Sequence, residues 1–536
     1  MSTFDLPIIS ADADPEFTDA KSCAAWLRTV PLINVAPSHG RLLGQLEELD
    51  CFEVDPTERL RILELLAAPT AFVQIEQARK YAGKPVPLAK QERDIFHGVV
   101  ALWDALSHGY QRCLNSIAEA GPELSGQCAL VCQRALWCAG QRITEHYKCY
   151  QELSGEDWKL LHRIYAIAEG HGVLDQRVTE PTDTARTTTC LRTYVQSLLL
   201  HRANDPSEQS SKQIALVSRW LEDWSHQVRI GRNPPPSESG IAPLAVDIAA
   251  GRGPGHALLS GDSVRFLELD QLAKSIRSRV ALLRKGGTPE ALGLGDDVSA
   301  AAAEQLLLVC HRHWCEEPKA RASTRHAVVT KAQLCAGLPA MHYYISGKIF
   351  RQPGEAKELT KTQREELATF GRIATRQDDQ YSMTHGYALE RWTIREESVG
   401  GLRIERGDDG GNGRFVQQQL IAVRPETSRG LSLGVVRWLS VSDDFELRAG
   451  VRMLPGVPQC VAVRAAGLNA KAEKYVQALL LPAVPALQSP ATLILPVGWY
   501  RPKRLIEVFS DKAEQILLTG VVDRGADFER LSIGVP

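Results

Sequence analysis

The chain lacks the signatures of several common protein classes. Its twelve cysteines include no C-x-x-C pair, and the sequence contains neither G-x-x-x-x-G-K-[ST] nor H-E-x-x-H. These absences exclude a zinc ribbon, a thioredoxin-like redox motif, a P-loop and a zincin helix. The longest aliphatic run, 478–487, is interrupted by Pro482 and Pro485. It is too short to cross a bilayer, so we expect no membrane insertion.

The chain also lacks a strong excess of either charge. Lysine and arginine number 62 against 64 aspartates and glutamates, for a formal net charge of -2. No global basic field therefore attracts a nucleic acid polymer, and an anionic ligand would need a local group of arginines. The first residues show no basic stretch followed by an apolar one, so we expect no secretory signal, a cytoplasmic protein and free, mostly buried cysteines.

The first part of the chain has the periodicity of helices. Apolar residues recur at helical spacing between about 15 and 228, for example at Leu42, Leu46 and Leu49, and glycine or proline marks many of the joints. The proline cluster that begins at Asn233 ends this block. We therefore predict a helical-hairpin domain over 1–232. A mixed, mainly helical domain should follow over 241–360, in which 328–333 and 341–345 fit either a strand or a helix.

From Arg391 onward the pattern changes to short alternating segments typical of strands. We predict a β-barrel domain over 361–464 and a β-rich C-terminal extension over 465–536. The extension could be a second small barrel or a segment that packs on the first. Residues 408–413, Asp-Asp-Gly-Gly-Asn-Gly, have the composition of a hairpin turn. The predicted fold class is therefore multidomain α+β, with a large helical region before an antiparallel barrel.

Two motifs and two strand-like segments follow one another in a characteristic order within this region. Arg372-Ile-Ala-Thr-Arg376 comes first, and twenty residues after Arg376 comes Glu396-Glu-Ser-Val-Gly-Gly401. Strand-like segments follow at 434–439 and 447–454. This order resembles PilZ domains, six-stranded barrels that bind the bacterial messenger cyclic di-GMP through an RxxxR arm and a [D/N]xSxxG turn.

The resemblance implies a ligand site made of five residues. Arg372 and Arg376 would grip phosphates and guanine faces, for which the planar guanidinium is suited. Glu396 and Ser398 would contact the ligand or the backbone, and Gly401 would allow its close approach. The turn has Glu396 where the family prefers Asp or Asn. Alternatively, the RxxxR spacing is solvated surface charge and the turn serves folding alone.

Other groups of chemically active residues are better explained by packing. On one helix, the cysteines and histidines of 310–315 would point to different faces and could not surround one metal ion. His97, Asp104 and His108 lack further carboxylates, and the G-x-S-x-G letters around Ser432 continue into a strand. We therefore predict no catalytic residue, no metal and no cofactor, and a protein that is not an enzyme.

Two functions remain compatible with these observations. The first is a cyclic di-GMP-binding regulatory protein of bacterial signalling, for example of motility, in which the barrel transmits nucleotide binding to a helical region that binds an unidentified protein partner. The alternative is a helical scaffold or adaptor with a degenerate PilZ-like domain that no longer binds nucleotide.

Overall fold

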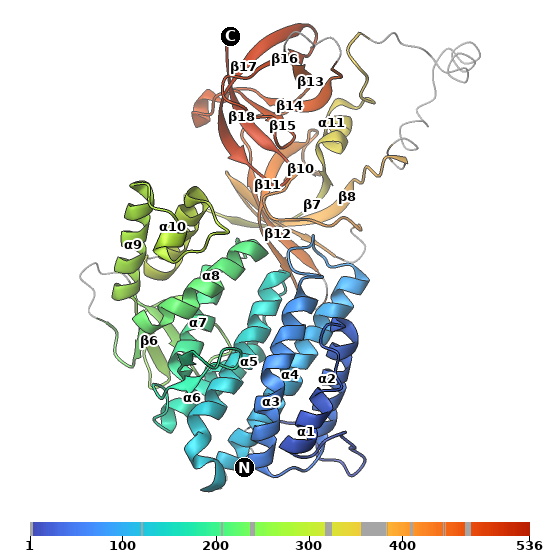
Figure 1. Cartoon of the computed structure of the whole chain (residues 1–536). Helices are drawn as coiled ribbons and strands as arrows, with labels where there is room; N and C mark the ends of the chain where they lie inside the picture. The colour runs from blue at the N-terminus through green and yellow to red at the C-terminus, as the bar shows by residue number, and fades with distance from the viewer. Residues whose placement is uncertain are drawn as a thin grey trace. The chain divides into compact units, whose positions relative to one another are not determined.

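The computed structural model divides the chain into two compact units, Met1–Lys84 with Leu88–Ala320 and Pro85–Pro87 with Arg321–Pro536. Figure 1 shows the helices and strands of each unit. The structure describes residues 4–118, 122–204, 207–235, 242–316, 324–354, 382, 384–407, 411–442, 444, 446–466 and 473–535.

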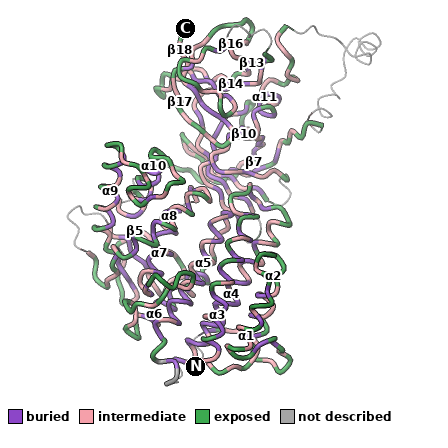
Figure 2. The backbone as a smooth tube through the Cα atoms, viewed as in Figure 1, coloured by how far each residue is buried: buried purple, intermediate pink, exposed green. Residues whose placement is uncertain are grey.

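The first unit consists mainly of helices that run back and forth. The helices are α1 (Ala20–Leu27), α2 (Val35–Cys51), α3 (Pro56–Ala78), α4 (Lys90–Ala118), α5 (Cys128–Lys148), α6 (Gly155–Gly170), α7 (Cys190–Ala203), α8 (Ser211–Trp224), α9 (Asp270–Arg284) and α10 (Ala300–Cys315). Consecutive helices from α2 to α5 pack on one another, as expected of helical hairpins. Buried residues line their facing sides (Figure 2). None of the described helices is long and apolar enough to cross a membrane.

Local sequence signals set the beginnings of several helices. Asp55 accepts hydrogen bonds from the backbone N–H groups of Thr57 and Glu58, and Pro56 occupies the first helical position of α3. Proline suits that position because its missing N–H has no intrahelical partner there. Ser154 and Ser210 begin α6 and α8 with capping boxes.

The segment between α8 and α9 of the first unit forms a small sheet. Its strands, in the order β3-β6-β4-β5, are β3 (Arg229–Gly231), β6 (Val264–Glu268), β4 (Leu244–Asp247) and β5 (Gly255–His256). Leu267 pairs with Ile230 in this sheet, and α9 begins after it at Asp270. Two further two-residue strands, β1 (Val178–Thr179) and β2 (Thr187–Thr188), form a separate pair.

The second unit contains two closed, antiparallel, six-stranded barrels. The first has the strand order β10-β11-β12-β9-β8-β7. Its strands are β7 (His326–Ala336), β8 (Glu390–Ser398), β9 (Gly401–Arg406), β10 (Leu420–Pro425), β11 (Ser432–Val441) and β12 (Leu447–Met453). The second has the order β13-β14-β15-β18-β17-β16. Its strands are β13 (Gln459–Ala465), β14 (Val476–Leu481), β15 (Thr492–Leu495), β16 (Leu505–Phe509), β17 (Ala513–Arg524) and β18 (Glu529–Gly534).

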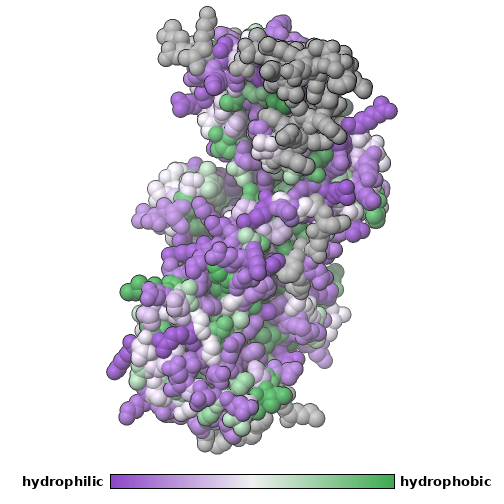
Figure 3. Space-filling view, turned by 90° about the vertical axis from the view of Figure 1, so that its right-hand side faces the viewer, coloured by the Kyte–Doolittle hydropathy of each residue, from purple (hydrophilic) through white to green (hydrophobic). Residues whose placement is uncertain are grey.

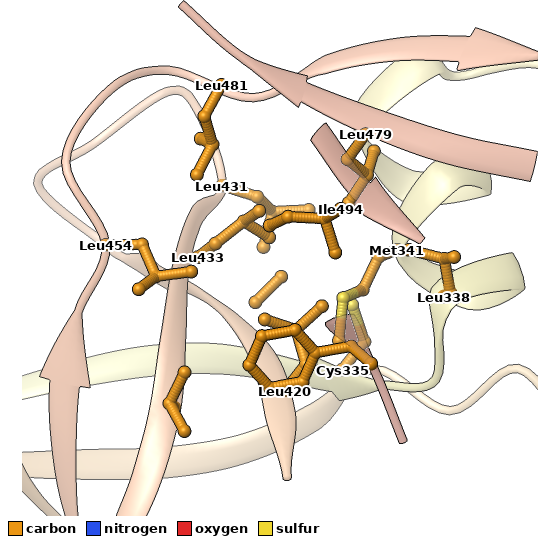
Figure 4. Packing of buried hydrophobic residues seen from close by; sticks show 13 residues of the cluster. Cys335, Leu338, Met341, Leu420, Leu431, Leu433, Leu454, Leu479, Leu481 and Ile494 are labelled. Atoms are coloured by element: carbon orange, nitrogen blue, oxygen red, sulfur yellow. The ribbon is translucent and has the colours of Figure 1, made fainter. Parts of the chain in front are cut away.

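The two barrels share one hydrophobic cluster, and the second barrel has a further cluster of its own. Leu420 and Leu433 of the first barrel pack in the same cluster as Leu479 and Ile494 of the second (Figure 4). Helix α11 (Leu338–Ser346) contributes Leu338 and Met341, which Figure 4 shows directed at this cluster, and the helix contacts strands of both barrels. A shared cluster of this kind links the barrels mechanically, because neither barrel can move without losing buried apolar contacts.

The fold agrees with the predicted class, multidomain α+β, but the chain is divided differently. The first barrel begins with β7 at His326 rather than at 361, and β13 at Gln459 already belongs to the second barrel, whereas we had placed the boundary at 464. Residues 328–333 are in a strand and 341–345 in a helix. The predicted hairpin at 408–413 is wrong. A hairpin there would require β9 to pair with β10. In the barrel β9 pairs with β8 and β12 instead.

The face of the molecule in Figure 3 is mostly hydrophilic where its residues are described. On the face in Figure 3, hydrophobic residues form small groups that are separated by hydrophilic ones. Isolated apolar residues of this kind are normal on a protein surface. The informative features are therefore ordered arrangements of charged or apolar residues, which are described below.

Candidate ligand-binding site

The hairpin of β8 and β9 carries the predicted turn motif. Ile394 pairs with Ile404 inside the barrel, but the next paired residue on β8 is Glu396, opposite Arg403. The extra residue, Arg395, creates a β-bulge, which turns two successive side chains toward the same side of a strand. Arg395 and Glu396 therefore both reach the acidic and basic groups on the outside of the barrel.

The turn itself is tight and depends on Ser398 and Gly401. These two residues pair with each other across the hairpin, and the Ser398 hydroxyl donates a hydrogen bond to the Gly401 carbonyl oxygen at 3.2 Å. A Cβ at position 401 would lie 2.9 Å from the carbonyl oxygen of Val451 on β12. Only glycine fits without a backbone shift, because real Cβ atoms do not approach an oxygen so closely.

Glu396 is held between two arginines. Its carboxylate accepts hydrogen bonds from Nη1 of Arg325 and Nη1 of Arg403, each at 3.0 Å. The hydrogen bonds from Arg325 and then from Arg403 lower the pKa of Glu396 below its usual value, so the group stays ionised at neutral pH. All three side chains remain partly exposed, at 39% for Arg325, 27% for Glu396 and 35% for Arg403. An incoming anion can therefore reach both guanidinium groups.

The ion pairs continue along the outside of the barrel through Glu405. This carboxylate lies 2.6 Å from Arg395 Nε, 3.6 Å from Arg403 Nη2 and 3.5 Å from Arg448 Nε. Arg448 also pairs with Glu446 at 3.2 Å. Exposed networks of this kind add little stability, because water and salt screen them. The arginines can therefore release a glutamate carboxylate and bind an anionic ligand in its place.

A cavity of about 620 Å³ opens on the same outer side of β7, β8 and β10. Its polar lining includes Lys331, Gln333, Arg391, Thr393, Glu405 and Arg424. The Nε of Arg424 donates to Gln333 Oε1 at 3.1 Å, whereas Lys331 and Arg391 form no ion pair within the part of the chain that the structure describes. The volume lies within the range of small-molecule sites. Its cations suit a ligand with negative charge.

The arrangement as a whole can bind an anion that also has flat polar surfaces. Arginines at the turn offer paired N–H donors to phosphate oxygens, and arginine side chains can also stack on aromatic rings. Glu396 offers an acceptor to an N–H group. The exposed serine–glycine bend allows close approach of a ligand to the backbone. These groups suit the recognition of a ligand.

The other end of the same hairpin has a different character. Glu390 and Arg406 form an ion pair at 2.9 Å, and their side chains are only 5% and 6% exposed. Glu390 also accepts from Trp392 Nε1 at 3.1 Å and from the backbone N–H of Gly413, while Arg406 donates to the Gly413 carbonyl oxygen. The guanidinium of Arg406 lies over the Trp392 ring. This network closes one end of the barrel and is inaccessible to a ligand.

The structure brings together only part of the predicted site. Glu396, Ser398 and Gly401 occupy one hairpin, whereas Arg372 and Arg376 lie outside the described residues. Arg325, which was not among the predicted site residues, precedes β7 and contacts Glu396 across 71 residues of sequence. A signal existed, because Arg321-Ala-Ser-Thr-Arg325 has the same RxxxR spacing.

The remaining clusters of histidine and acidic side chains form hydrogen bonds and ion pairs with neighbouring residues. The carbonyl oxygen of Arg202 lies 3.0 Å from His313 Nδ1, and His311 pairs with Glu316. Asp104 pairs with Arg142 at 2.8 Å. Among the described residues no group of histidine, cysteine and carboxylate side chains could hold a metal ion. Ser432 is the first residue of β11, so no helix follows it as a nucleophile elbow requires.

Comparison with known proteins adds independent information. A family model described as "Cyclic-di-GMP receptor FimW, N-terminal domain" matches residues 21–236, which include α1 to α8. A second, described as "FimW C-terminal beta-barrel domain", matches residues 461–534, which form the second barrel. The protein "Cyclic-di-GMP receptor FimW" of Pseudomonas aeruginosa is 22% identical over 522 residues, covering 90% of this chain and 84% of that protein.

Proposed function

We propose that this chain is a cyclic di-GMP receptor, a binding regulator rather than an enzyme. The similarity to the P. aeruginosa receptor extends over 90% of the chain, and both matching family models concern that receptor. These similarities favour a nucleotide receptor over a scaffold that has lost its ligand. Because cyclic di-GMP is a bacterial messenger, such a receptor would act in the bacterial cytoplasm, and motility is a plausible output.

The proposed ligand site is the outer side of the first barrel around the β8–β9 turn. The observation that carries this assignment is the hydrogen bonding of Glu396 to Arg325 and Arg403 directly beside Ser398 and Gly401. This barrel has six antiparallel strands, the architecture that PilZ domains use for the same nucleotide. We assign it to a PilZ-like domain on the combination of strand number and turn motif.

The proposed recognition uses the arginines for phosphate and the turn for the base. Arg325 and Arg403 already hold a carboxylate, so a phosphate can take its place without rearrangement of the strands. Ser398 and Gly401 then lie against the nucleotide, and Arg391 and Arg424 in the neighbouring cavity extend the positive surface. Glu396 accepts a hydrogen bond from the edge of a guanine.

Two arginine pairs compete for the role of the ligand arm. Arg372 and Arg376 precede β8, whereas Arg321 and Arg325 precede β7. We favour the pair that contains Arg325, because its side chain contacts the turn motif. Arg372 and Arg376 remain candidates, as a second clamp that closes over the bound nucleotide.

Isothermal titration calorimetry of the full chain with cyclic di-GMP tests the proposal. We expect a micromolar or lower dissociation constant. Arg325→Ala should raise this constant by at least about tenfold, because a charge-assisted contact contributes about 1.5–3 kcal/mol. Arg429→Ala is the matched control, because Arg429 is exposed and has no part in the site. Arg372→Ala and Arg376→Ala complete the series.

The outcomes separate the alternatives. If the unmodified chain produces no heat at high micromolar cyclic di-GMP, the receptor assignment is overturned and the scaffold alternative replaces it. If Arg372→Ala or Arg376→Ala abolishes binding and Arg325→Ala does not, the arm is the later pair. Cyclic di-AMP in the same cell should bind far more weakly, because it lacks the guanine edge.

The output surface is proposed to belong to the helical unit. Ligand binding would change the conformation of the first barrel. The hydrophobic cluster that the two barrels share would transmit this change to the second barrel. A protein partner of the helical unit would then respond to the nucleotide. Pull-down with and without cyclic di-GMP should give a partner whose yield changes with the nucleotide.

A further inference from the structure

Helix α3 carries an ordered apolar stripe on its solvent side. Exposed residues recur along it at spacings of four, three, four, three and four, in the order Arg61, Leu65, Ala68, Phe72, Ile75 and Arg79. Leu65, Phe72 and Ile75 are 37%, 46% and 57% exposed. Alternating steps of three and four are the spacing of a coiled-coil seam, in which residues meet a facing helix.

The rest of α3 shows that the stripe is not a by-product of an ordinary surface helix. A surface helix normally has one apolar side and one charged side. In α3 the inner side is fully buried, for example at Ile62, Leu66 and Val73, and the outer side is apolar as well. A helix that is apolar on opposite sides is suited to be covered on both.

The stripe is self-complementary when a second copy of α3 runs antiparallel to it. With the midpoint of the stripe on a two-fold axis, Leu65 faces Ile75 of the second copy, and Ala68 faces Phe72. Each copy therefore places its largest ring opposite the smallest side chain of the other. This match of large to small is what close packing requires, and it occurs twice in an isologous interface.

At each end of the stripe the same register places Arg61 opposite Arg79 of the second copy, and a glutamate of each helix lies one turn away from these arginines. Arg61 pairs with Glu58 on its own helix, and Arg79 pairs with Glu76 at 2.7 Å. In the antiparallel pair Arg61 lies one turn from Glu76 of the second copy, and Arg79 lies one turn from Glu58. Both arginines are well exposed, at 63% and 70%, and can exchange a partner on the same helix for one on the other copy.

We propose that the chain forms a dimer through an antiparallel pair of α3 helices. Leu65 to Ile75 spans ten residues, or about 15 Å along the helix, so the contact is short and the interface small. The dimer should be in a micromolar equilibrium with the monomer. Such an interface would pair two receptors without using any residue of the nucleotide site.

The experiment is sedimentation equilibrium of the full chain over a range of concentrations. Phe72→Glu should raise the dimer dissociation constant by at least about tenfold, because burial of a central aromatic anchor dominates a small interface. Leu308→Glu, at a residue that is 43% exposed on α10, is the matched control and should leave the constant unchanged. Far-ultraviolet circular dichroism checks that both variants are folded.

A size swap tests the pairing register. Ala68→Phe should weaken the dimer, since two large rings then face each other, although the surface becomes more apolar. Ala68→Phe with Phe72→Ala should restore it, because the large and small positions are exchanged on both copies. A monomer at every concentration overturns the proposal, and so does a dimer that Phe72→Glu leaves intact. Strengthening by Ala68→Phe alone overturns the antiparallel register and points to nonspecific association.

Discussion

The two ends of the β8–β9 hairpin hold glutamate–arginine pairs of similar geometry in very different surroundings. Glu390 and Arg406 lie 2.9 Å apart and are almost completely buried, whereas Glu396 lies 3.0 Å from two arginines that water can reach. A buried pair cannot be separated without leaving a charge in a medium of low polarity. An exposed pair can be separated at little cost, because water or another ion replaces the partner. Distance alone therefore does not reveal which pair is structural and which can bind a ligand.

The largest expected effect concerns the buried end. Glu390→Gln leaves Arg406 without its counter-ion beside Trp392, and we expect the free energy of unfolding to fall by about 3–5 kcal/mol. Urea denaturation measures the change. Glu397→Gln, at an exposed residue of the same strand, should change the stability by no more than about 0.5 kcal/mol. Equal effects of the two substitutions would remove the distinction between the two ends.

A second prediction concerns binding at the exposed end. Arg403→Ala should leave the midpoint of urea denaturation almost unchanged but weaken cyclic di-GMP binding by about tenfold or more. The unmodified chain should also bind less tightly as salt increases, because the contacts to phosphate are screened. Titrations at two salt concentrations give both numbers. A large loss of stability without loss of binding would show that the exposed network is structural.

The sequence predicted this hairpin well but not its surroundings. The alternation around Trp392 and Ile404 indicated strands because inner and outer residues have clearly different polarity. It did not reveal that β7 belongs to the same barrel, because a long segment separates β7 from β8 in sequence. Nor could turn composition at 408–413 tell which strands pair, since pairing is set by the core and not by the loop.

Only part of the site was predicted, because the turn is local in sequence and its contact with β7 is not. Ser398 and Gly401 are recognisable because the turn is local in sequence, and its geometry is fixed by a few residues. Arg325 contacts Glu396 only after β7 pairs with β8, which no local pattern encodes. The RxxxR spacing occurs four times in the chain, and the order of motifs in the resemblance, with the arm about twenty residues before the turn, favoured Arg372 and Arg376.

A third prediction tests the packing that holds the exposed end in place. Gly401→Ala places a Cβ 2.9 Å from the Val451 carbonyl oxygen, so β9 or β12 must shift. We expect a loss of about 1–3 kcal/mol in the free energy of unfolding, together with weaker ligand binding. Gly400→Ala is the control, because a Cβ there would meet no atom within 4 Å. If Gly401→Ala were as stable as Gly400→Ala, the close approach of β12 would not constrain the turn.

The smallest expected effect tests whether the charge of Glu396 competes with the ligand at the exposed end. Glu396→Gln retains a carbonyl acceptor for a guanine edge but removes the negative charge that competes with phosphate for Arg325 and Arg403. We expect cyclic di-GMP to bind a few-fold more tightly to this variant at pH 7, because less than about 1 kcal/mol is at stake at an exposed pair. Calorimetric titration of both proteins measures the ratio of their dissociation constants.

The pH dependence of that ratio gives the sign of the effect. Hydrogen bonds from Arg325 lower the pKa of Glu396, so its ionised form is favoured in the folded chain, and its stabilising contribution is present above the usual pKa of a glutamate. That contribution is lost as the pH falls through the lowered pKa. The advantage of Glu396→Gln should therefore be constant between pH 6 and 8, roughly the range in which the carboxylate stays fully charged. Weaker binding by the variant throughout this range would mean that the charge of Glu396 helps to hold the ligand instead of competing with it.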